Sequence, residues 1–201
     1  MKTSMAVLLA LVFTSALSAQ TLTKTERKDA VKYINWCTKE LKKSLKGLSE
    51  AQLNYKPGAD RWSPQDCMYH IAFSEGALRS FLDQALNAPA DPKAKAEIKT
   101  TDEEIKAGIV NRTNKFKTAE SFQPENTGFK SLAEAVAAFD SKRAMLIDLV
   151  KTTEADLRNH IVAHPAGKMD AYQFILFIAG HSNRHTQQIN EVKTVAGYPG
   201  S

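Results

Sequence analysis

The sequence predicts an all-α domain, a four-helix bundle with a long crossover between its second and third helices. Three observations predict it. Apolar residues recur at helical spacing in four long segments. Helix-capping patterns stand at the ends of these segments. The composition, with 201 residues, 24% charged and 43% hydrophobic, suits one globular domain with a sizeable core.

The first helix is expected from about Thr23 to Lys46, because Gly47 follows and glycine commonly ends helices. Its inward-facing residues are Val31, Ile34, Thr38, Leu41 and Leu45. Residues 48–62 then form a short helical turn and a Pro-Gly turn that brings Trp62 to the end of the bundle. We expect Trp62 to be a packing residue.

The second helix begins at the N-cap Ser63, with Pro64 in the first helical position, and ends near Asn87. The pattern weakens over residues 88–128, where Thr101-Asp-Glu-Glu-Ile is expected to begin a short helix. This segment is the predicted crossover. Its sequence does not decide between a simple connection and a lid.

The third helix opens with the capping box Ser131-Leu-Ala-Glu134 and ends near Lys151. Its inward-facing residues are Leu132, Val136, Phe139, either Met145 or Leu146, and Leu149. A return loop over residues 153–169 contains the turn His164-Pro-Ala-Gly, and residues 170–194 form the last helix.

Three histidines lie on inward faces. His181 and His185 are one turn apart in a stripe with Phe174, Ile178, Ile189 and Val192, and His70 lies in the stripe of the second helix. If the second and fourth helices are parallel neighbours, His70 lies about 10 Å and His181 about 16 Å along them, so the three imidazoles can converge. The alternative is a hydrogen-bonded histidine group in a helical interaction module.

Two residues are candidates for contacts behind these histidines. Gln188 shares the face of His181 and His185, and Asp66 lies one turn before His70. Arg184 lies off that face and is expected at the surface or in an ion pair between helices. His160 and His164 belong to no apolar stripe, and we expect them at the surface or at the rim of the site.

The N-terminal residues predict export. Lys2 precedes an apolar run from Met5 to Phe13, and small residues end at Ala19, so we expect a signal peptide over residues 1–19, cleavage after Ala19, and a periplasmic or secreted protein over residues 20–201. An uncleaved N-terminal anchor stays open. No other stretch is long and apolar enough to cross a membrane.

The net charge of +5 comes from lysines scattered over helical polar faces, which argues against a nucleic-acid partner. The two cysteines, Cys37 and Cys67, are expected at different heights in the first two helices. We therefore expect two buried free thiols rather than a disulfide.

Several motifs resemble the DinB-like superfamily of bacterial four-helix metalloproteins. They are Arg61-Trp-Ser-Pro before His70, Asp170-Ala-Tyr-Gln, and His181-Ser-Asn-Arg-His185-Thr-Gln-Gln-Ile. The resemblance covers essentially the whole mature chain. It implies an up-down-down-up bundle and one divalent metal ion, often nickel or zinc, held by His70, His181 and His185.

Three neutral imidazoles with open coordination positions are typical of a catalytic rather than a structural metal site. The resemblance includes thiol-dependent enzymes that use a low-molecular-weight cytosolic thiol, which an exported protein would not meet. The first hypothesis is therefore an exported metal-dependent hydrolase of an unknown small molecule. The alternatives are a non-catalytic metal-binding or stress-related protein, and a thiol-dependent transferase of the kind that the resemblance includes. A homodimer stays open.

Overall fold

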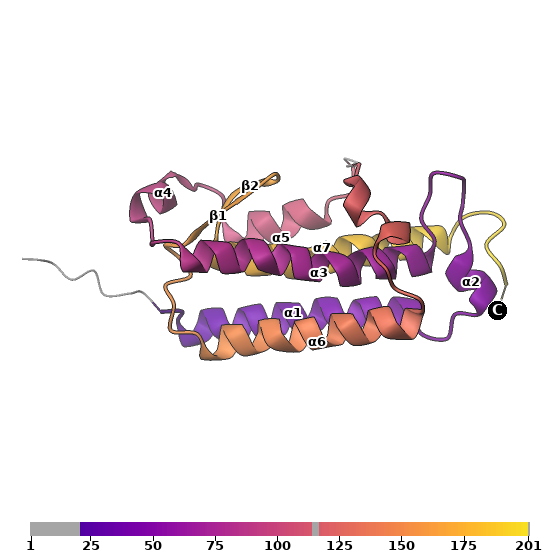
Figure 1. The fold of residues 1–201 in the computed structure, drawn as a ribbon, viewed down its shortest axis with the longest axis horizontal. Coiled ribbons are helices and arrows are strands. Elements are labelled where there is room, and N and C mark those ends of the chain that lie inside the picture. Colours follow the sequence, from indigo (N-terminus) through magenta and orange to yellow (C-terminus); the bar gives the residue numbers. More distant parts are fainter. Residues whose placement is uncertain (1–20, 114–116, 201) are drawn as a thin grey trace, which may run out of the picture.

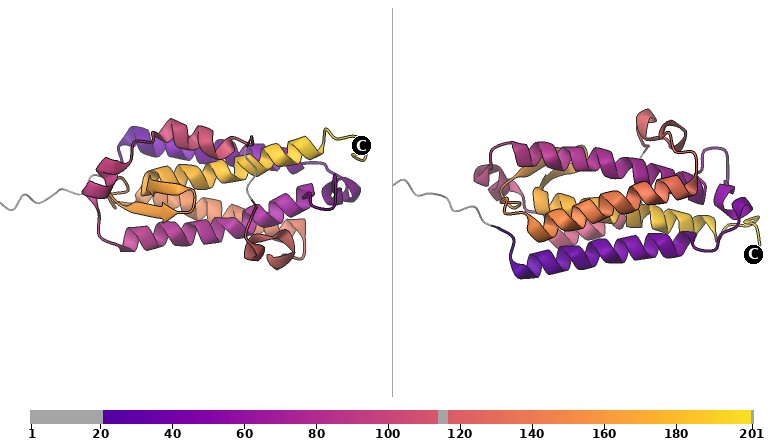
Figure 2. Two further views of the ribbon diagram at one scale, coloured as in Figure 1. Left: turned by 90° about the horizontal axis from the view of Figure 1, so that it is seen from above. Right: turned by 60° about the horizontal axis from the view of Figure 1, so that its bottom comes forward.

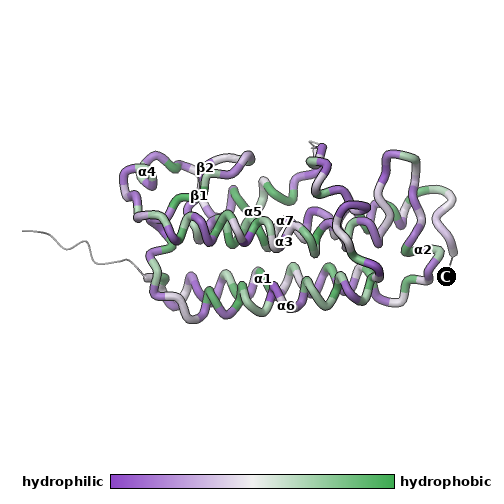
Figure 3. Tube along the Cα trace, in the orientation of Figure 1, coloured by the Kyte–Doolittle hydropathy of each residue, from purple (hydrophilic) through white to green (hydrophobic). Residues whose placement is uncertain are grey.

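Four long helices form the bundle within residues 21–113 and 117–200, which this computed structural model describes (Figure 1). They are α1 (Lys24–Leu45), α3 (Pro64–Asn87), α6 (Leu132–Thr152) and α7 (Ala171–Val192). Each carries alternating hydrophobic and hydrophilic stretches, the mark of an amphipathic helix (Figure 3). The bundle and the crossover between its second and third long helices confirm the predicted fold class. The predicted signal peptide, residues 1–19, lies outside the described residues.

The helices run up, down, down and up. In Figures 1 and 2, α1 and α7 run in one direction and α3 and α6 in the other. This confirms the up-down-down-up topology that the family resemblance implies. The expectation that the second and fourth long helices are parallel, as in a simple alternating bundle, is wrong. Because α3 and α7 are antiparallel, the start of α3 lies beside the end of α7. His70 lies about 9 Å from the start of α3, and His185 lies about 10 Å from the end of α7. The two histidines are therefore at the same level along the bundle.

Local capping explains where the long helices begin. Thr23, Ser63 and Asp170 are the N-caps of α1, α3 and α7, and each forms a complete capping box. At α6 only half of the predicted box forms. The Ser131 hydroxyl accepts from the Glu134 N–H at 3.1 Å, but the Glu134 carboxylate accepts from the N–H of Lys130 at 2.8 Å.

The core consists of two clusters at the two ends of the bundle. Cys37 belongs to the cluster around Phe174, and Cys67 belongs to the cluster around Phe139. Both cysteines are buried and free, which confirms the predicted thiols and their different heights. On α6, Leu146 faces the core, while Met145 is 60% exposed.

The crossover packs a fifth helix on the bundle. It contains α4 (Pro92–Glu97), α5 (Asp102–Val110) and the 3-10 helices η1 (Glu120–Phe122) and η2 (Pro124–Asn126). Helix α5 lies against α7 so closely that a Cβ at Gly180 would come within 2.4 Å of Ile109 Cγ2. Because α5 covers its outer side, α7 is buried nearly all round.

Two shorter features complete the structure. Helix α2 (Glu50–Asn54) is the predicted helical turn after α1. The return loop contains an unpredicted antiparallel hairpin of β1 (Ile161–His164) and β2 (Gly167–Asp170), joined by the predicted turn. Strands of four residues are too short for a reliable alternation pattern. In the described part of the chain, none of the helices has the length and hydropathy of a membrane span.

Candidate metal centre

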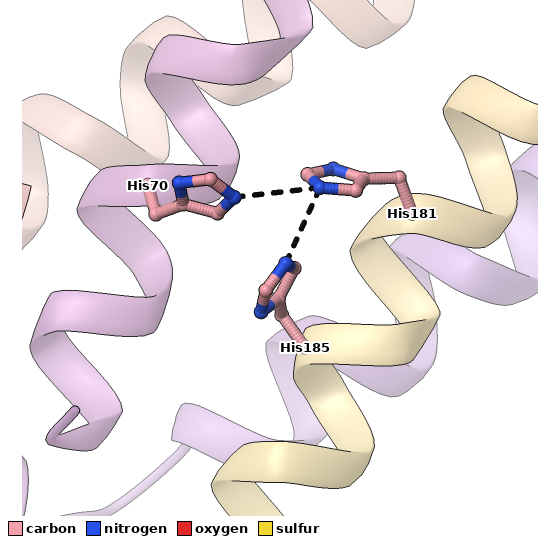
Figure 4. A group of neighbouring side chains, drawn as sticks. All are labelled: His70, His181 and His185. Carbon is pink, nitrogen blue, oxygen red and sulfur yellow. Dashed lines mark hydrogen bonds between the residues drawn. The ribbon is translucent and has the colours of Figure 1, made fainter. Parts of the chain in front are cut away.

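Three imidazoles converge between α3 and α7. Figure 4 shows His70 on α3 facing His181 and His185, which are one turn apart on α7. His181 Nε2 lies 3.4 Å from His70 Nε2 and 3.2 Å from His185 Nε2. One nitrogen from each ring lies within 4.8 Å of the other two. Two imidazole nitrogens on one zinc ion are about 3.3 Å apart in tetrahedral geometry, so these separations suit a shared cation.

The outer nitrogens of two rings have defined partners. His70 Nδ1 lies 2.8 Å from the carbonyl oxygen of Phe122 in η1, and His185 Nδ1 lies 3.0 Å from Gln188 Oε1. Both partners are oxygen acceptors, so each Nδ1 carries the proton and each Nε2 presents its lone pair to the cluster. Two lone pairs aimed at one point are what a cation requires. The donor set therefore fits a divalent metal ion.

The third ring is less constrained. His181 Nδ1 is buried and has no hydrogen-bond partner among the described residues, so nothing fixes its tautomer. The Ser74 hydroxyl lies 3.4 Å from His70 Nε2 and can hold that nitrogen in the metal-free protein. His181 is half-buried, whereas His70 and His185 are buried.

Burial keeps the histidines neutral. Desolvation lowers the pKa of His70, and it holds the pKa values of His181 and His185 well below the usual value. Mutual repulsion between the rings adds to this effect at His181 and His185. All three are therefore in the deprotonated form that binds metal at neutral pH.

Trp62 lies directly against the cluster. Its ring centroid is 4.7 Å from that of His70 and 5.7 Å from that of His185, on which it stacks. Trp62 packs against the core cluster around Phe139, which confirms the expected packing role, and its indole also covers one side of the histidine pair. The turn that delivers Trp62 to the bundle end is the sequence signal for this position.

A buried ion pair lies behind the histidines. Arg143 Nη2 donates to Glu75 Oε1 at 2.6 Å and to Ser182 Oγ at 2.9 Å, and only 2% of each charged side chain is exposed. Arg143 Nε and Nη1 are buried without a hydrogen-bond partner in the described part of the chain. The pair joins α6 to the segments of α3 and α7 that carry the cluster. Sequence reasoning missed it, since a lone arginine in a polar pattern indicates a surface.

Of the two residues expected to contact the histidines from behind, Gln188 does so and Asp66 does not. Gln188 contacts His185 as its spacing indicates. Asp66 does not lie at the ring of His70. Its carboxylate accepts from the N–H of Ser63 at 3.0 Å and pairs with Lys56 at 2.9 Å, because its place in the capping box turns it back to the helix start.

Three further expectations are corrected or located. Arg184 is buried beneath α5, so of its two expected positions the surface is wrong. It does contact another helix, because it donates to the carbonyl oxygens of Ile109 and Asn111 at the end of α5. His160 Nδ1 lies 3.0 Å from the Ala85 carbonyl oxygen. The ring of His164 packs against Phe174 and two other phenylalanines, outside the cluster.

Comparison with known proteins gives the family and supports the fold. The family model described as the DinB superfamily matches residues 33–189. The uncharacterized protein YuaE of Bacillus subtilis (strain 168) is 27% identical over 150 residues, which cover 74% of this chain and 88% of that protein. The structure of Bacillus subtilis YfiT matches with a TM-score of 0.56 and 15% identity, over 87% of this chain and 89% of that one. YfiT is described as a probable metal-dependent hydrolase with an unusual four-helix bundle topology.

Proposed function

The chain belongs to the DinB superfamily, and from this premise we propose that it binds one divalent metal ion through His70, His181 and His185 and hydrolyses a small molecule. The observation that carries the proposal is the convergence of three neutral imidazoles, of which His70 and His185 have their outer nitrogens held by Phe122 and Gln188. The description of YfiT supports the reaction class. Nickel and zinc are the ions we propose, because borderline metals favour imidazole ligands.

A divalent ion held in this way supplies Lewis acidity, which lowers the pKa of a water molecule toward about 7 and polarises a carbonyl or phosphoryl oxygen. The protein does the rest. Phe122 and Gln188 keep the lone pairs of His70 and His185 directed inward. Trp62 covers one side of the rings, and we propose that a small substrate approaches by way of His181, the least buried of the three histidines.

The location of the protein is part of the proposal. The N-terminal pattern supports export with Gln20 as the first mature residue. Mass spectrometry of the native protein gives this terminus directly. An N-terminal mass that includes residues 1–19 would contradict cleavage.

Metal content tests the ligand set. We expect the untagged protein to contain about one divalent ion per chain, and His185→Ala to contain much less, because one of three ligands is removed. The control is His160→Ala, which removes a histidine outside the cluster. Equal metal content in all three proteins would refute the ligand assignment.

Activity tests the reaction class. The zinc- and nickel-loaded proteins are assayed against carboxylic esters, amides and phosphate esters of small size. We expect hydrolysis that EDTA abolishes and His185→Ala lacks. Metal binding without turnover of any ester or amide would favour a non-catalytic metal-binding protein, and turnover only with an added thiol would favour a transferase.

A further inference from the structure

The crossover reaches the histidine cluster through Arg112. This residue follows Asn111, the C-cap of α5, and its guanidinium extends to α7. Arg112 Nε and Nη2 donate to the two carboxylate oxygens of Glu191 at 2.7 and 2.8 Å, a bidentate pair. Arg112 Nη1 donates to Gln188 Oε1 at 3.4 Å. The same Gln188 oxygen faces His185 Nδ1.

The backbone that carries Arg112 is itself fixed to α7. Arg184 donates to the carbonyl oxygens of Ile109 and Asn111, at the end of α5. The close approach of Ile109 to Gly180 brings α5 onto α7 just before the histidines. Arg112 therefore starts from a packed part of the crossover, and its side chain is only 16% exposed.

The chemistry of these groups gives Arg112 a specific effect. A glutamine side chain can turn either its oxygen or its NH₂ toward a histidine, and each choice selects a different tautomer of the imidazole. A guanidinium has donors only. Beside Arg112, the oxygen of Gln188 must face the guanidinium, and this oxygen also faces His185. The proton of His185 is then required on Nδ1, which leaves Nε2 free as the inward ligand atom.

We propose that Arg112 is a positioning residue that sets the tautomer of His185 through Gln188 and thereby prepares its Nε2 for metal. Its role in metal binding rests on the proposed function, whereas the tautomer does not. Glu191 balances the charge of Arg112, so that the guanidinium can act close to a cation site. The crossover is thus more than a connection, since it supplies Arg112 for His185 and the Phe122 carbonyl for His70.

The sign of the effect on affinity separates positioning from charge. Arg112→Met removes a positive charge near the site. Because like charges repel, this change alone would strengthen the binding of a cation. Loss of the positioning of His185 would instead weaken the binding of the cation. Outer contacts of metal-binding histidines change affinity about 10–100-fold, and for Arg112, one contact farther out, we expect about 3–10-fold weaker binding of zinc.

The experiment uses the full mature protein and zinc alone. Long-range ¹H–¹⁵N spectra of the metal-free protein at pH 8 give the tautomer of His185, and chelator competition gives the zinc Kd. In the wild type we expect His185 in the Nδ1–H form. In Arg112→Met we expect a mixture of tautomers or the Nε2–H form, and we expect the same result in Gln188→Leu, which keeps Arg112. The control Arg79→Met removes an arginine from the exposed pair with Asp83 and should change neither quantity.

A rescue makes the test specific. Glutamate at position 188 has acceptor oxygens only, so in the Gln188→Glu background the Arg112→Met substitution should no longer change the tautomer of His185. An unchanged tautomer in Arg112→Met and Gln188→Leu, or zinc binding that is equal or tighter in Arg112→Met, would overturn the inference. If neither the wild type nor any variant binds zinc but the tautomer changes as expected, the proposed function fails and the positioning role of Arg112 stands.

Discussion

Replacement of Gly180 by alanine tests the contact that holds the crossover on the bundle. The new Cβ would lie 2.4 Å from Ile109 Cγ2 and 3.0 Å from the Tyr33 hydroxyl, closer than atoms in van der Waals contact. Alanine favours a helix interior over glycine by about 1 kcal/mol. Overpacking costs about 1–3 kcal/mol, and Cγ2 cannot move without the rest of Ile109. We therefore expect Gly180→Ala to lower the free energy of unfolding by up to about 2 kcal/mol.

Gly108→Ala is the matched control. Gly108 lies on α5, the helix that faces Gly180, and a Cβ there meets no atom within 4 Å. It should stabilise the protein by about 0.5–1 kcal/mol. Thermal unfolding measures both variants, at about 2–4 °C for each kcal/mol in a chain of this size. If Gly180→Ala stabilises as much as Gly108→Ala, or if Ile109→Ala does not relieve its loss, the packing argument is refuted.

Three other predictions concern buried groups. Because burial lowers the pKa of the three cluster histidines, unfolding of the metal-free protein takes up protons as the pH falls toward and below 6.5. The free energy of unfolding in urea should therefore be lower at pH 5.5 than at pH 7.5, by up to about 1.4 kcal/mol per pH unit for each histidine, and equal values would contradict the burial effect. Arg143→Met leaves Glu75 buried without its cation and should lower the free energy of unfolding in urea by about 3–5 kcal/mol. Adding Glu75→Leu to Arg143→Met should restore most of this loss, and a double variant that is less stable than Arg143→Met alone would refute the prediction. Burial raises the pKa of Cys37 to about 12 and also raises the pKa of Cys67, so mass spectrometry should show that iodoacetamide adds no alkyl group to the folded protein. After unfolding without reductant it should add two, and an unfolded protein that stays unlabelled would contain a disulfide.

The sequence was sufficient for the starts of the long helices and for the faces on which their residues lie. Ser63 and Asp170 mark the starts of α3 and α7 through side chains that cap their own helices. The periodicity of α7 places His181 and His185 on one face, because spacing along a helix determines direction around its axis. These signals lie within a few residues of one another, so no tertiary information is needed to recognise them.

Helix direction and long-range partners could not be derived in this way. A periodic pattern shows that a face is buried but not which helix covers it, so residue spacing alone left α3 and α7 parallel. The contact of Phe122 with His70 uses a backbone carbonyl, which every residue possesses and no side-chain pattern reveals. Burial of Arg143 depends on Glu75, a partner 68 residues away.

One missed feature did leave a signal. The segment from Tyr172 to Ala179 is apolar around most of the helix, which indicates burial on more than one side. That pattern requires a further cover for α7, which α5 provides. The same cover accounts for the burial of Arg184, whose charge otherwise favours a surface position.

The central claim is that three histidines bind one divalent ion. X-ray absorption at the metal edge of the zinc-loaded protein measures the ligands directly. The account predicts three imidazole nitrogens at about 2.0–2.1 Å, and two in the His185→Ala variant. A wild-type spectrum without imidazole scattering, or one that His185→Ala leaves unchanged, would contradict it.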